Sequence, residues 1–340
     1  MPAPVDPLDP MSQEWPGVSV VMPVLDEERH LRSAVGHVLS QEYPGALELV
    51  LALGPSSDRT DEVATEIAAT DARVRFVPNP TGATGAGLNL AVGSARHQIV
   101  VRVDGHSMLP TDYVRLAVET LLRTGADNVG GVMAAQGVTD FQRAVAAAMT
   151  SPLGVGQARF HVGGEEGPVD TVYLGVFQRS ALERVGGYDE AFLRAQDWEL
   201  NHRIRSTGGT VWFTPKLEVS YRPRSTVRAL AKQYRNYGRW RRVVMHRYPA
   251  TANLRYLAPP LAVLGITTGT VAGIAGFRWG LLLPGGYLAG VLAGSAIIGR
   301  DLPPRARLWL PLVFATMHGS WGLGFLLSPR SLRTDRERND

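Results

Sequence analysis

The sequence predicts an α/β fold with a mostly parallel sheet flanked by helices, followed by a C-terminal α-helical membrane region. Within residues 17–221, short apolar runs without polar alternation are separated by helical segments, which is typical of a parallel sheet covered on both faces. Beyond residue 256, three long stretches are almost free of charge. The 340 residues are enough for two ordinary domains.

Four strands and three helices are predicted in the first part of the domain at 17–221. The lead segment 1–16 is acidic and proline-rich and lacks the apolar core of a signal peptide, so we expect it to be disordered. The predicted strands are Val18–Met22, Leu47–Leu53, Val74–Val77 and Ile99–Val103. The predicted helices cover about 27–40, 61–69 and 86–95.

The fourth strand ends on Asp104-Gly105-His106. Parallel sheets bind ligands at the carboxyl ends of their strands. A carboxylate and an imidazole on one side of a tight turn suit Mn²⁺ or Mg²⁺, which keeps its other positions for water and diphosphate oxygens. The alternative is a turn aspartate beside an incidental surface histidine, and this tripeptide alone does not exclude it.

A basic segment follows at 222–256. Nine Arg or Lys and no acid lie between Arg222 and Arg247, although the net charge of the chain is only +4. Apolar residues recur every three to four positions from Val227 to Val244, which predicts an amphipathic helix. Its tryptophan and tyrosines are typical of helices at a membrane surface, so we expect it on the cytoplasmic leaflet. Its cations could also hold a lipid diphosphate; a purely anchoring helix is the alternative.

Three apolar stretches, at Leu257–Gly276, Trp279–Ile298 and Leu308–Leu327, have about the ~20 residues that cross a bilayer. Two or three transmembrane helices are therefore expected within 257–328, before a charged tail at 329–340. Arginines flank the last stretch on both sides, so one segment could be re-entrant. Three buried helices of a soluble domain are the alternative. These spans argue against a nucleic-acid partner, and the lack of cysteine excludes disulfides and thiolate chemistry.

Several longer motifs carry a resemblance to a known family. VSVVMPVLDEERHL, SSDRTDEV, VRVDGHS and AQDWELNHRIRSTGG have the order and approximate spacing of the family 2 inverting glycosyltransferases with the GT-A fold. ADNVGGVM, SPLGVGQARFHVGGEEGPVDTVYLG and QYRNYGRW resemble the branch of succinoglycan-type membrane-bound glucosyltransferases. The likeness covers roughly residues 17–260. It implies a nucleotide-diphospho-sugar transferase fold, with the GT-A catalytic domain at 17–221.

The resemblance implies the roles of the charged residues. Asp104 and His106 would bind Mn²⁺ or Mg²⁺ and the donor diphosphate, with His106 in the place of a commoner second aspartate, so metal affinity should fall as this histidine is protonated. Asp197 matches the general base, which takes the proton of the attacking acceptor hydroxyl. Glu199 is the competing candidate. The alternative for both acids is that they only cap and decorate their helix.

The implied nucleotide-sugar contacts lie on several loops of the sheet. They are Pro23, Leu25, Glu27, Asp58, Asn89 and Asp104. Asp58 equally fits a helix N-terminal cap. The acid that usually contacts uracil a few residues before it is replaced by Leu53-Gly54-Pro55.

The implied acceptor or lipid side is formed by Gln196, Trp198, Gln233, Arg239 and Trp240. Processive synthases of this superfamily carry Gln-x-x-Arg-Trp. Here Asn236 occupies the glutamine place, which favours addition of a single sugar.

The implied reaction is transfer of a hexose, glucose from UDP-glucose, to a polyprenyl-diphosphate-linked sugar in exopolysaccharide or cell-envelope glycan assembly. The enzyme would be a multi-pass protein of the cell membrane with its catalytic domain in the cytoplasm, beside other polysaccharide-assembly enzymes. Three alternatives stay open: polyprenyl phosphate as the acceptor, a catalytically silent membrane scaffold of the same fold, and a nucleotidyltransferase.

Overall fold

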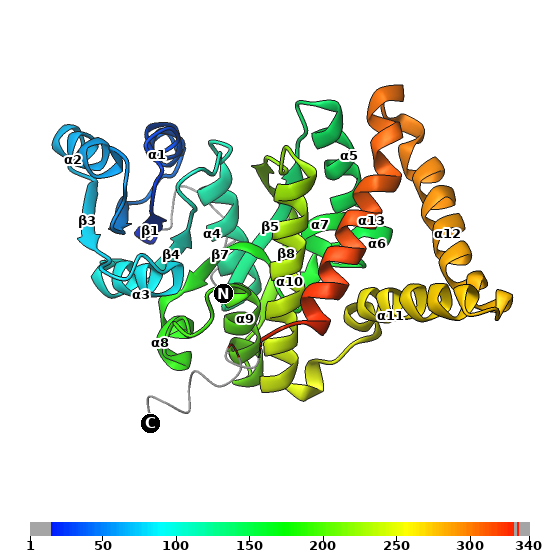
Figure 1. The fold of residues 1–340 in the computed structure, drawn as a ribbon. Helices are drawn as coiled ribbons and strands as arrows, with labels where there is room; N and C mark the ends of the chain where they lie inside the picture. The colour runs from blue at the N-terminus through cyan, green and yellow to red at the C-terminus, as the bar shows by residue number, and fades with distance from the viewer. Residues whose placement is uncertain (1–14, 330–331, 333–340) are drawn as a thin grey trace, which may run out of the picture.

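The computed structural model describes residues 15–329 and residue 332, and its centre is one eight-stranded sheet (Figure 1). The order of the strands is β3-β2-β1-β4-β7-β5-β8-β6. Most of the predicted lead segment 1–16 and of the predicted tail 329–340 lies outside the described residues. The prediction of a mostly parallel sheet flanked by helices is confirmed.

The N-terminal half of the sheet is parallel, as its unbroken apolar runs predict. Its strands are β1 (Val18–Val24), β2 (Leu47–Leu53), β3 (Val74–Pro78) and β4 (Ile99–Arg102). The helices between them are α1 (Leu31–Leu39), α2 (Thr60–Thr70) and α3 (Thr84–Ser94). β1 continues beyond Met22, so Pro23 lies in the strand, opposite Ala52 of β2, rather than in the loop expected there.

The other half of the sheet is mixed. Its strands are β5 (Asn128–Ala135), β6 (Gly167–Pro168), β7 (Tyr173–Gln178) and β8 (Val211–Tyr221). β7 runs antiparallel between β4 and β5, whereas β5 and β8 are parallel. The helices of this half are α4 (Tyr113–Thr124), α5 (Asp140–Met149), α6 (Pro152–Val155), α7 (Arg159–Val162), α8 (Arg179–Val185) and α9 (Gln196–Ser206).

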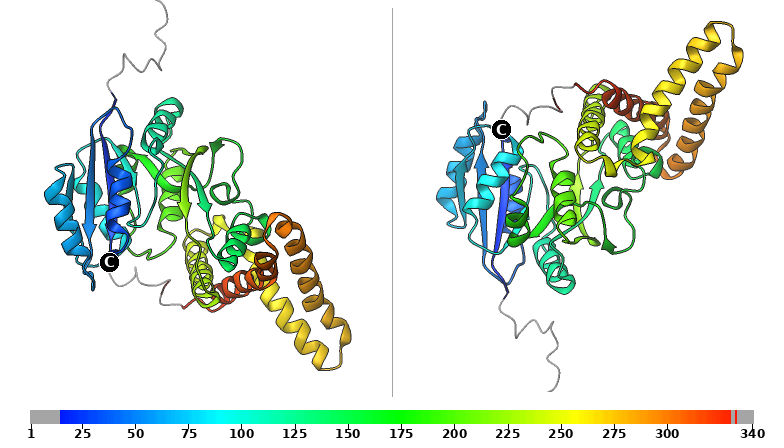
Figure 2. Two further views of the ribbon diagram at one scale, coloured as in Figure 1. Left: turned by 90° about the horizontal axis from the view of Figure 1, so that it is seen from above. Right: turned by 90° about the horizontal axis from the view of Figure 1, so that it is seen from below.

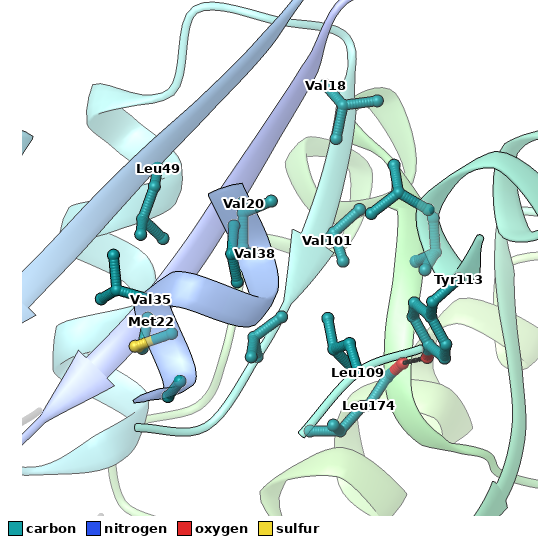
Figure 3. Close-up of a cluster of buried hydrophobic side chains, with 14 of the residues drawn as sticks. Val18, Val20, Met22, Val35, Val38, Leu49, Val101, Leu109, Tyr113 and Leu174 are labelled. Atoms are coloured by element: carbon teal, nitrogen blue, oxygen red, sulfur yellow. Dashed lines mark hydrogen bonds between the residues drawn. The ribbon is translucent and has the colours of Figure 1, made fainter. Parts of the chain in front are cut away.

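A buried apolar cluster fixes the sheet against its helices (Figure 3). Met22 of β1 lies beside Val35 of α1, and both are almost fully buried. Tyr113 of α4 is buried as well, and its hydroxyl donates a hydrogen bond of 3.1 Å to the carbonyl oxygen of Leu174. Each such side chain contributes about 1.5–3 kcal/mol by burial. This rigid core holds the carboxyl ends of β1 and β4 in register.

The basic helix α10 (Val227–Arg247) packs along α13 (Pro304–Leu326), as Figure 1 shows. Its apolar residues Leu230, Tyr234, Trp240 and Val244 are buried inside the protein. The predicted helix is present, but the structure differs from the expectation that its apolar face lies on the membrane. Segments far apart in sequence supply a protein surface that covers this face instead.

Two helices extend away from the rest of the molecule, α11 (Leu254–Ile274) and α12 (Leu282–Ile298) (Figure 2). Short 3-10 turns flank them: η1 (Pro249–Thr251), η2 (Arg278–Leu281) and η3 (Gly299–Asp301). Among the described residues, two segments are long and apolar enough to cross a membrane, 254–274 and 278–301. The third predicted span falls in α13, which packs against α5 and α10 with Leu310 and Phe314 fully buried.

Candidate active site

Arg102 links the two acids that the sequence singled out. It is the last residue of β4, and Asp104 follows it at the carboxyl end of the parallel strands. Arg102 Nη2 donates to Asp104 Oδ1 over 3.1 Å, and Arg102 Nη1 donates to Asp197 Oδ1. The structure therefore brings Asp104 and Asp197 to one guanidinium group, although 95 residues separate Arg102 from Asp197.

The positive charge of Arg102 is stabilised by a neighbouring carboxylate. Its side chain is buried. Burial alone would lower the pKa of the Arg102 guanidinium, but the charge and the hydrogen bond of Asp104 raise it. The sequence motifs did not single out Arg102. A cation at the end of the apolar run IVVR is the signal that could have identified it, since buried cations are rare without partners.

Asp197 lies in the first turn of α9. Ala195, just before the helix, has a φ of 62°, a left-handed conformation that costs a non-glycine residue about 1–2 kcal/mol. This bend directs the start of α9 towards β4. The partial positive charge at a helix N-terminus favours an ionised carboxylate. The Asp197 side chain is 37% exposed, so a substrate hydroxyl can reach it.

Glu199 is engaged in structural contacts. It is fully buried, and its two carboxylate oxygens accept hydrogen bonds of 2.7 Å from Nε and Nη2 of Arg203. Tyr248 donates a third hydrogen bond of 2.7 Å to Glu199 Oε1. A carboxylate held in this way has little freedom to accept a proton from a substrate. Of the two candidates for the base, the geometry favours Asp197.

His106 pairs with Glu27. Its Nδ1 lies 2.8 Å from Glu27 Oε1, and this hydrogen bond raises the pKa of His106 above its ordinary value. Because a carboxylate accepts here, Nδ1 carries the proton and Nε2 keeps a lone pair that can bind a metal. Gly105 lets the loop after β4 lie close to Glu27, since a Cβ at that position would be only 3.1 Å from Glu27 Cγ. Glu27, predicted to contact the nucleotide, thus supports the predicted metal site.

The donor atoms at this edge of the sheet fit a divalent cation. Both Arg102 hydrogen bonds to Asp104 end on Oδ1, which leaves Oδ2 for a metal. Within the part of the chain that the structure describes, no group of three or more His, Asp or Glu gathers into a complete metal site. Two protein ligands suit Mn²⁺ or Mg²⁺ when diphosphate oxygens and water supply the rest.

Asp58 ties the loop after β1 to the start of α2. Its Oδ1 accepts from the backbone N–H of Thr60 over 3.0 Å, and its Oδ2 accepts from that of Glu28 over 3.1 Å. The Thr60 hydroxyl also donates to Asp58, and this bond leads the effects that lower the pKa of the carboxyl group. Asp58 thus binds the N–H of the first residue of α2, although the N-cap position itself is Arg59. Its contact with a nucleotide stays a prediction.

Leu25 lies where the sequence lacks the usual uracil-contacting acid. It is 41% exposed. A Cβ added to Gly54 would lie 3.0 Å from Leu25 Cδ1 and 3.2 Å from the Cα of Gly82, so these three residues are in close contact. They present an apolar surface beside the loop of Asp58. The nucleotide contacts predicted for Pro23 and Leu25 stay predictions.

Asn89 connects α3 to the segment that leads to α9. Its Nδ2 donates to the Tyr188 carbonyl and to Glu190 Oε1, both over 2.9 Å. Its Oδ1 accepts from the Tyr188 N–H over 2.8 Å. The amide group is therefore used within the protein, and the predicted nucleotide contact stays a prediction.

The predicted acceptor-side residues divide into two groups. Trp198 and Trp240 lie in one apolar cluster with Phe192, whose ring centroid is 6.0 Å from that of Trp240. Gln196, beside Trp198 in sequence, is buried. Gln233 lies about two helical turns before Trp240 in α10, and its Nε2 donates to the hydroxyls of Tyr221 and Tyr237. The Nε of Arg239 is buried without a hydrogen-bond partner among the described residues.

Comparison with known proteins matches this chain to one enzyme family. The model of "Glycosyl transferase family 2" matches residues 19–186. "Succinoglycan biosynthesis protein ExoA" of Rhizobium meliloti (strain 1021) is 33% identical over 90% of this chain and 93% of that protein. This chain belongs to glycosyltransferase family 2. The predicted family and enzyme class are confirmed.

More distant proteins also match. A dolichyl N-acetyl-α-D-glucosaminyl phosphate 3-β-D-2,3-diacetamido-2,3-dideoxy-β-D-glucuronosyltransferase of Methanococcus voltae is 22% identical over 65% of this chain and 71% of its own length. Among solved structures, mannosyltransferase PcManGT from Pyrobaculum calidifontis, in complex with GDP-Man and Mn²⁺, has a TM-score of 0.60 and 18% identity. That match covers 93% of this chain and 88% of the mannosyltransferase. It confirms the predicted GT-A fold.

Proposed function

We propose that this enzyme is a metal-dependent inverting glycosyltransferase that transfers a hexose from a nucleotide sugar to a lipid-linked acceptor. The observation that carries the proposal is the position of Arg102 between Asp104 and Asp197. One acid would hold the metal and the donor diphosphate, and the other would activate the acceptor hydroxyl. Inverting glycosyl transfer needs these two functions side by side.

In the proposed reaction Asp197 accepts the proton of the acceptor hydroxyl as its oxygen attacks the anomeric carbon. The new oxygen–carbon bond forms on the face of the anomeric carbon opposite the diphosphate. The bond between this carbon and the diphosphate oxygen breaks, and the diphosphate leaves with the electron pair. Arg102 holds the two carboxylates on one guanidinium group before substrates bind. Asp104 and His106 would hold the Mn²⁺ or Mg²⁺, which would supply charge stabilisation to the leaving diphosphate.

We propose UDP-glucose as the donor. Structures with this fold hold nucleotide sugars, among them GDP-Man in the mannosyltransferase and UDP-GlcNAc in Staphylococcus aureus TarS 1–349, which has a TM-score of 0.51 and 13% identity. The apolar surface of Leu25, Gly54 and Gly82 would face the nucleobase without the usual acid. Base selection would then depend more on shape than on a charged contact.

We propose a polyprenyl-diphosphate-linked sugar as the acceptor, used in polysaccharide assembly. The succinoglycan protein is a relative over nearly the whole chain, and the Methanococcus relative acts on a lipid-linked sugar phosphate by its name. The segments 254–274 and 278–301 are long and apolar enough to cross a membrane. They would anchor the enzyme as a multi-pass protein of the cell membrane, with its catalytic domain on the cytoplasmic side.

The test is a panel of nucleotide sugars with purified full-length protein and Mn²⁺, with and without a membrane lipid extract. We expect nucleotide release from one UDP-sugar that needs the lipid and is lost in Asp197→Asn. The mobility and diphosphate content of the lipid product separate a lipid-diphosphate-linked acceptor from polyprenyl phosphate itself. If no donor is turned over and none binds in a metal-dependent way, the chain is a silent scaffold of the same fold.

A further inference from the structure

A cavity outside the Asp104 site lies between the α7 region and the first turn of α11. Its volume is about 260 Å³. The polar and charged side chains that line it are Gln157, Arg159, Asp170, Thr171 and Arg255. The Thr171 hydroxyl accepts a hydrogen bond of 2.9 Å from Asn201 of α9, so one wall of the cavity is fixed to the helix that carries Asp197.

Two guanidinium groups meet beside this cavity on one aromatic ring. The Cζ atoms of Arg241 and Arg255 lie 3.8 Å and 4.5 Å from the ring centroid of Tyr256. Arg241 also lies over the ring of Trp198, 4.6 Å from its centroid. Arg241 Nη1 and Arg255 Nε are buried, and neither has a hydrogen-bond partner among the described residues.

The nearby charges do not neutralise this pair. The charge of Asp170, the acid of the cavity, acts on Arg241 only from a distance, since its ion pair over 3.3 Å is with Arg205. Burial lowers the pKa of Arg241 to about 10, so it stays charged at neutral pH. Burial and then the charge of Arg255 lower the pKa of His161 to about 4, so this histidine is neutral there and its buried Nδ1 also lacks a partner.

Two partly buried cations with unpaired nitrogen atoms are costly unless an anion binds them. Guanidinium groups bind phosphate oxygens by pairs of charge-assisted hydrogen bonds, which would use the nitrogen atoms that the protein leaves unpaired. The cavity beside them is polar and about as large as the lower end of the range for small-molecule sites. The arrangement is that of an anion-binding pocket.

We propose that Arg241 and Arg255 bind the phosphate or diphosphate group of the lipid-linked acceptor. This inference rests on the proposed function. Arg255 belongs to the first turn of α11, a helix long and apolar enough to cross a membrane. The end of such a helix lies at the level of the lipid phosphates. Arg241 contacts Trp198, the neighbour of Asp197 in sequence. The pocket thus joins the membrane end of the acceptor to the base.

The donor diphosphate is a less suitable occupant. It has its own ligands at Asp104 and His106, on the loop after β4. Arg255, in contrast, follows α10 in the sequence and belongs to the hairpin of α11 and α12 (Figure 2). An anion bound by Arg255 would therefore be the phosphate of a lipid that reaches the pocket from the membrane.

The test measures binding of farnesyl diphosphate to the full-length protein in detergent, by isothermal titration calorimetry, without any turnover. We expect Arg241→Gln and Arg255→Gln each to weaken binding at least about tenfold, because each removes charge-assisted hydrogen bonds. Arg235→Gln is the matched control, since Arg235 is an exposed arginine of the same helix. Binding of the nucleotide-sugar donor should be equal in all four proteins, which also shows that the variants are folded.

Competition distinguishes the sources of the phosphate. Inorganic diphosphate should displace farnesyl diphosphate, and phosphatidylglycerol micelles should not. Equal displacement by phosphatidylglycerol would overturn the proposal in favour of a contact with bulk lipid headgroups. Unchanged binding in both arginine variants, or a parallel loss of donor binding, would overturn it as well. Because no sugar transfer is measured, failure of the proposed function would appear separately, as absent turnover by the wild-type enzyme.

Discussion

Arg102 is the residue on which both reacting carboxylates depend. It donates to Asp104 and to Asp197, so its loss removes the contact that brings the two acids together. In Arg102→Gln we expect kcat/KM to fall by about 10–100-fold, because hydrogen bonds to charged groups contribute about 1.5–3 kcal/mol. Arg102→Lys should restore part of the rate, because it keeps the cation. An unchanged kcat/KM in Arg102→Gln would show that this contact is not needed for transfer.

Glu27 fixes the ring of His106 at the predicted metal site. Loss of a carboxylate that orients a metal-binding histidine typically costs about 10–100-fold in metal affinity. We expect a decrease of this size for Glu27→Gln in Mn²⁺ titrations followed by electron paramagnetic resonance, with nucleoside diphosphate present. Glu28→Gln, on the half-buried neighbouring residue, is the control. Equal Mn²⁺ affinity in wild type and Glu27→Gln would exclude this role of the pair.

At this scale the sequence predicted single residues better than their partners. The motifs identify Asp104, His106 and Asp197, because each follows a recognisable local pattern. The partners Glu27 and Arg102 lie 79 and 95 residues away from His106 and Asp197, and no local pattern records such contacts. For Glu199 the sequence left two roles open, and only burial and the contacts with Arg203 and Tyr248 separate them.

At the scale of elements, Glu48 of β2 links β1, β3 and the loop before β4. Its carboxylate accepts from the Ser19 hydroxyl over 2.6 Å, from Arg75 Nε over 3.0 Å and from the N–H of Arg96 over 2.7 Å. Burial alone would raise the pKa of Glu48, but these hydrogen bonds lower it. A group with a lowered pKa in the folded state stabilises the protein above its unfolded pKa. That contribution is lost as the pH falls through the folded value.

Glu48→Gln should therefore lower the free energy of unfolding by about 1–3 kcal/mol at pH 7. The difference from wild type should shrink from about pH 5 downwards, as the wild-type carboxyl becomes protonated. Thermal unfolding in detergent across this pH range measures the effect, with the exposed Glu62→Gln as a control. A difference that stays constant with pH would mean that the charge of Glu48 is not involved.

Glycines allow α10 and α13 to approach each other. A Cβ at Gly324 of α13 would overlap the carbonyl oxygen of Arg235 of α10, whereas a Cβ at Gly319 of the same helix would meet nothing within 4 Å. We expect Gly324→Ala to destabilise the protein by about 1–3 kcal/mol or more. Gly319→Ala should be neutral or stabilise it by up to about 1 kcal/mol, through helix propensity. Equal unfolding temperatures of the two variants would contradict this packing.

The amphipathic pattern of α10 shows what a sequence leaves open at this scale. It predicts the helix and its apolar face, because a 3.6-residue period is a local property. It does not identify the surface that covers the face. Trp240 and Tyr234 read as membrane-facing residues, yet they are buried inside the protein. The partner helix α13 comes from the far end of the chain, so no local signal marks the pairing.

At the scale of the whole molecule, the chain leaves the catalytic domain through α10, extends in α11 and α12, and returns in α13 (Figure 1). The return along α10 ties the hairpin to the domain that carries Asp197. The N-terminal parallel half of this fold follows from its unbroken apolar runs, whereas β5 to β8 were not predicted from the sequence. Their mixed pairing depends on long-range contacts.

In the proposed reaction Asp197, and not Glu199, activates the acceptor. The most direct test is single-turnover transfer of labelled sugar into the lipid fraction by the wild type, Asp197→Asn and Glu199→Gln. We predict that Asp197→Asn reduces the rate by about 10²–10⁴-fold, with donor affinity and unfolding temperature unchanged. Glu199→Gln should lower the unfolding temperature, because it breaks contacts with Arg203 and Tyr248, while its folded fraction still transfers sugar. If Asp197→Asn transferred sugar at the wild-type rate and a stably folded Glu199→Gln did not, Asp197 would not be the base.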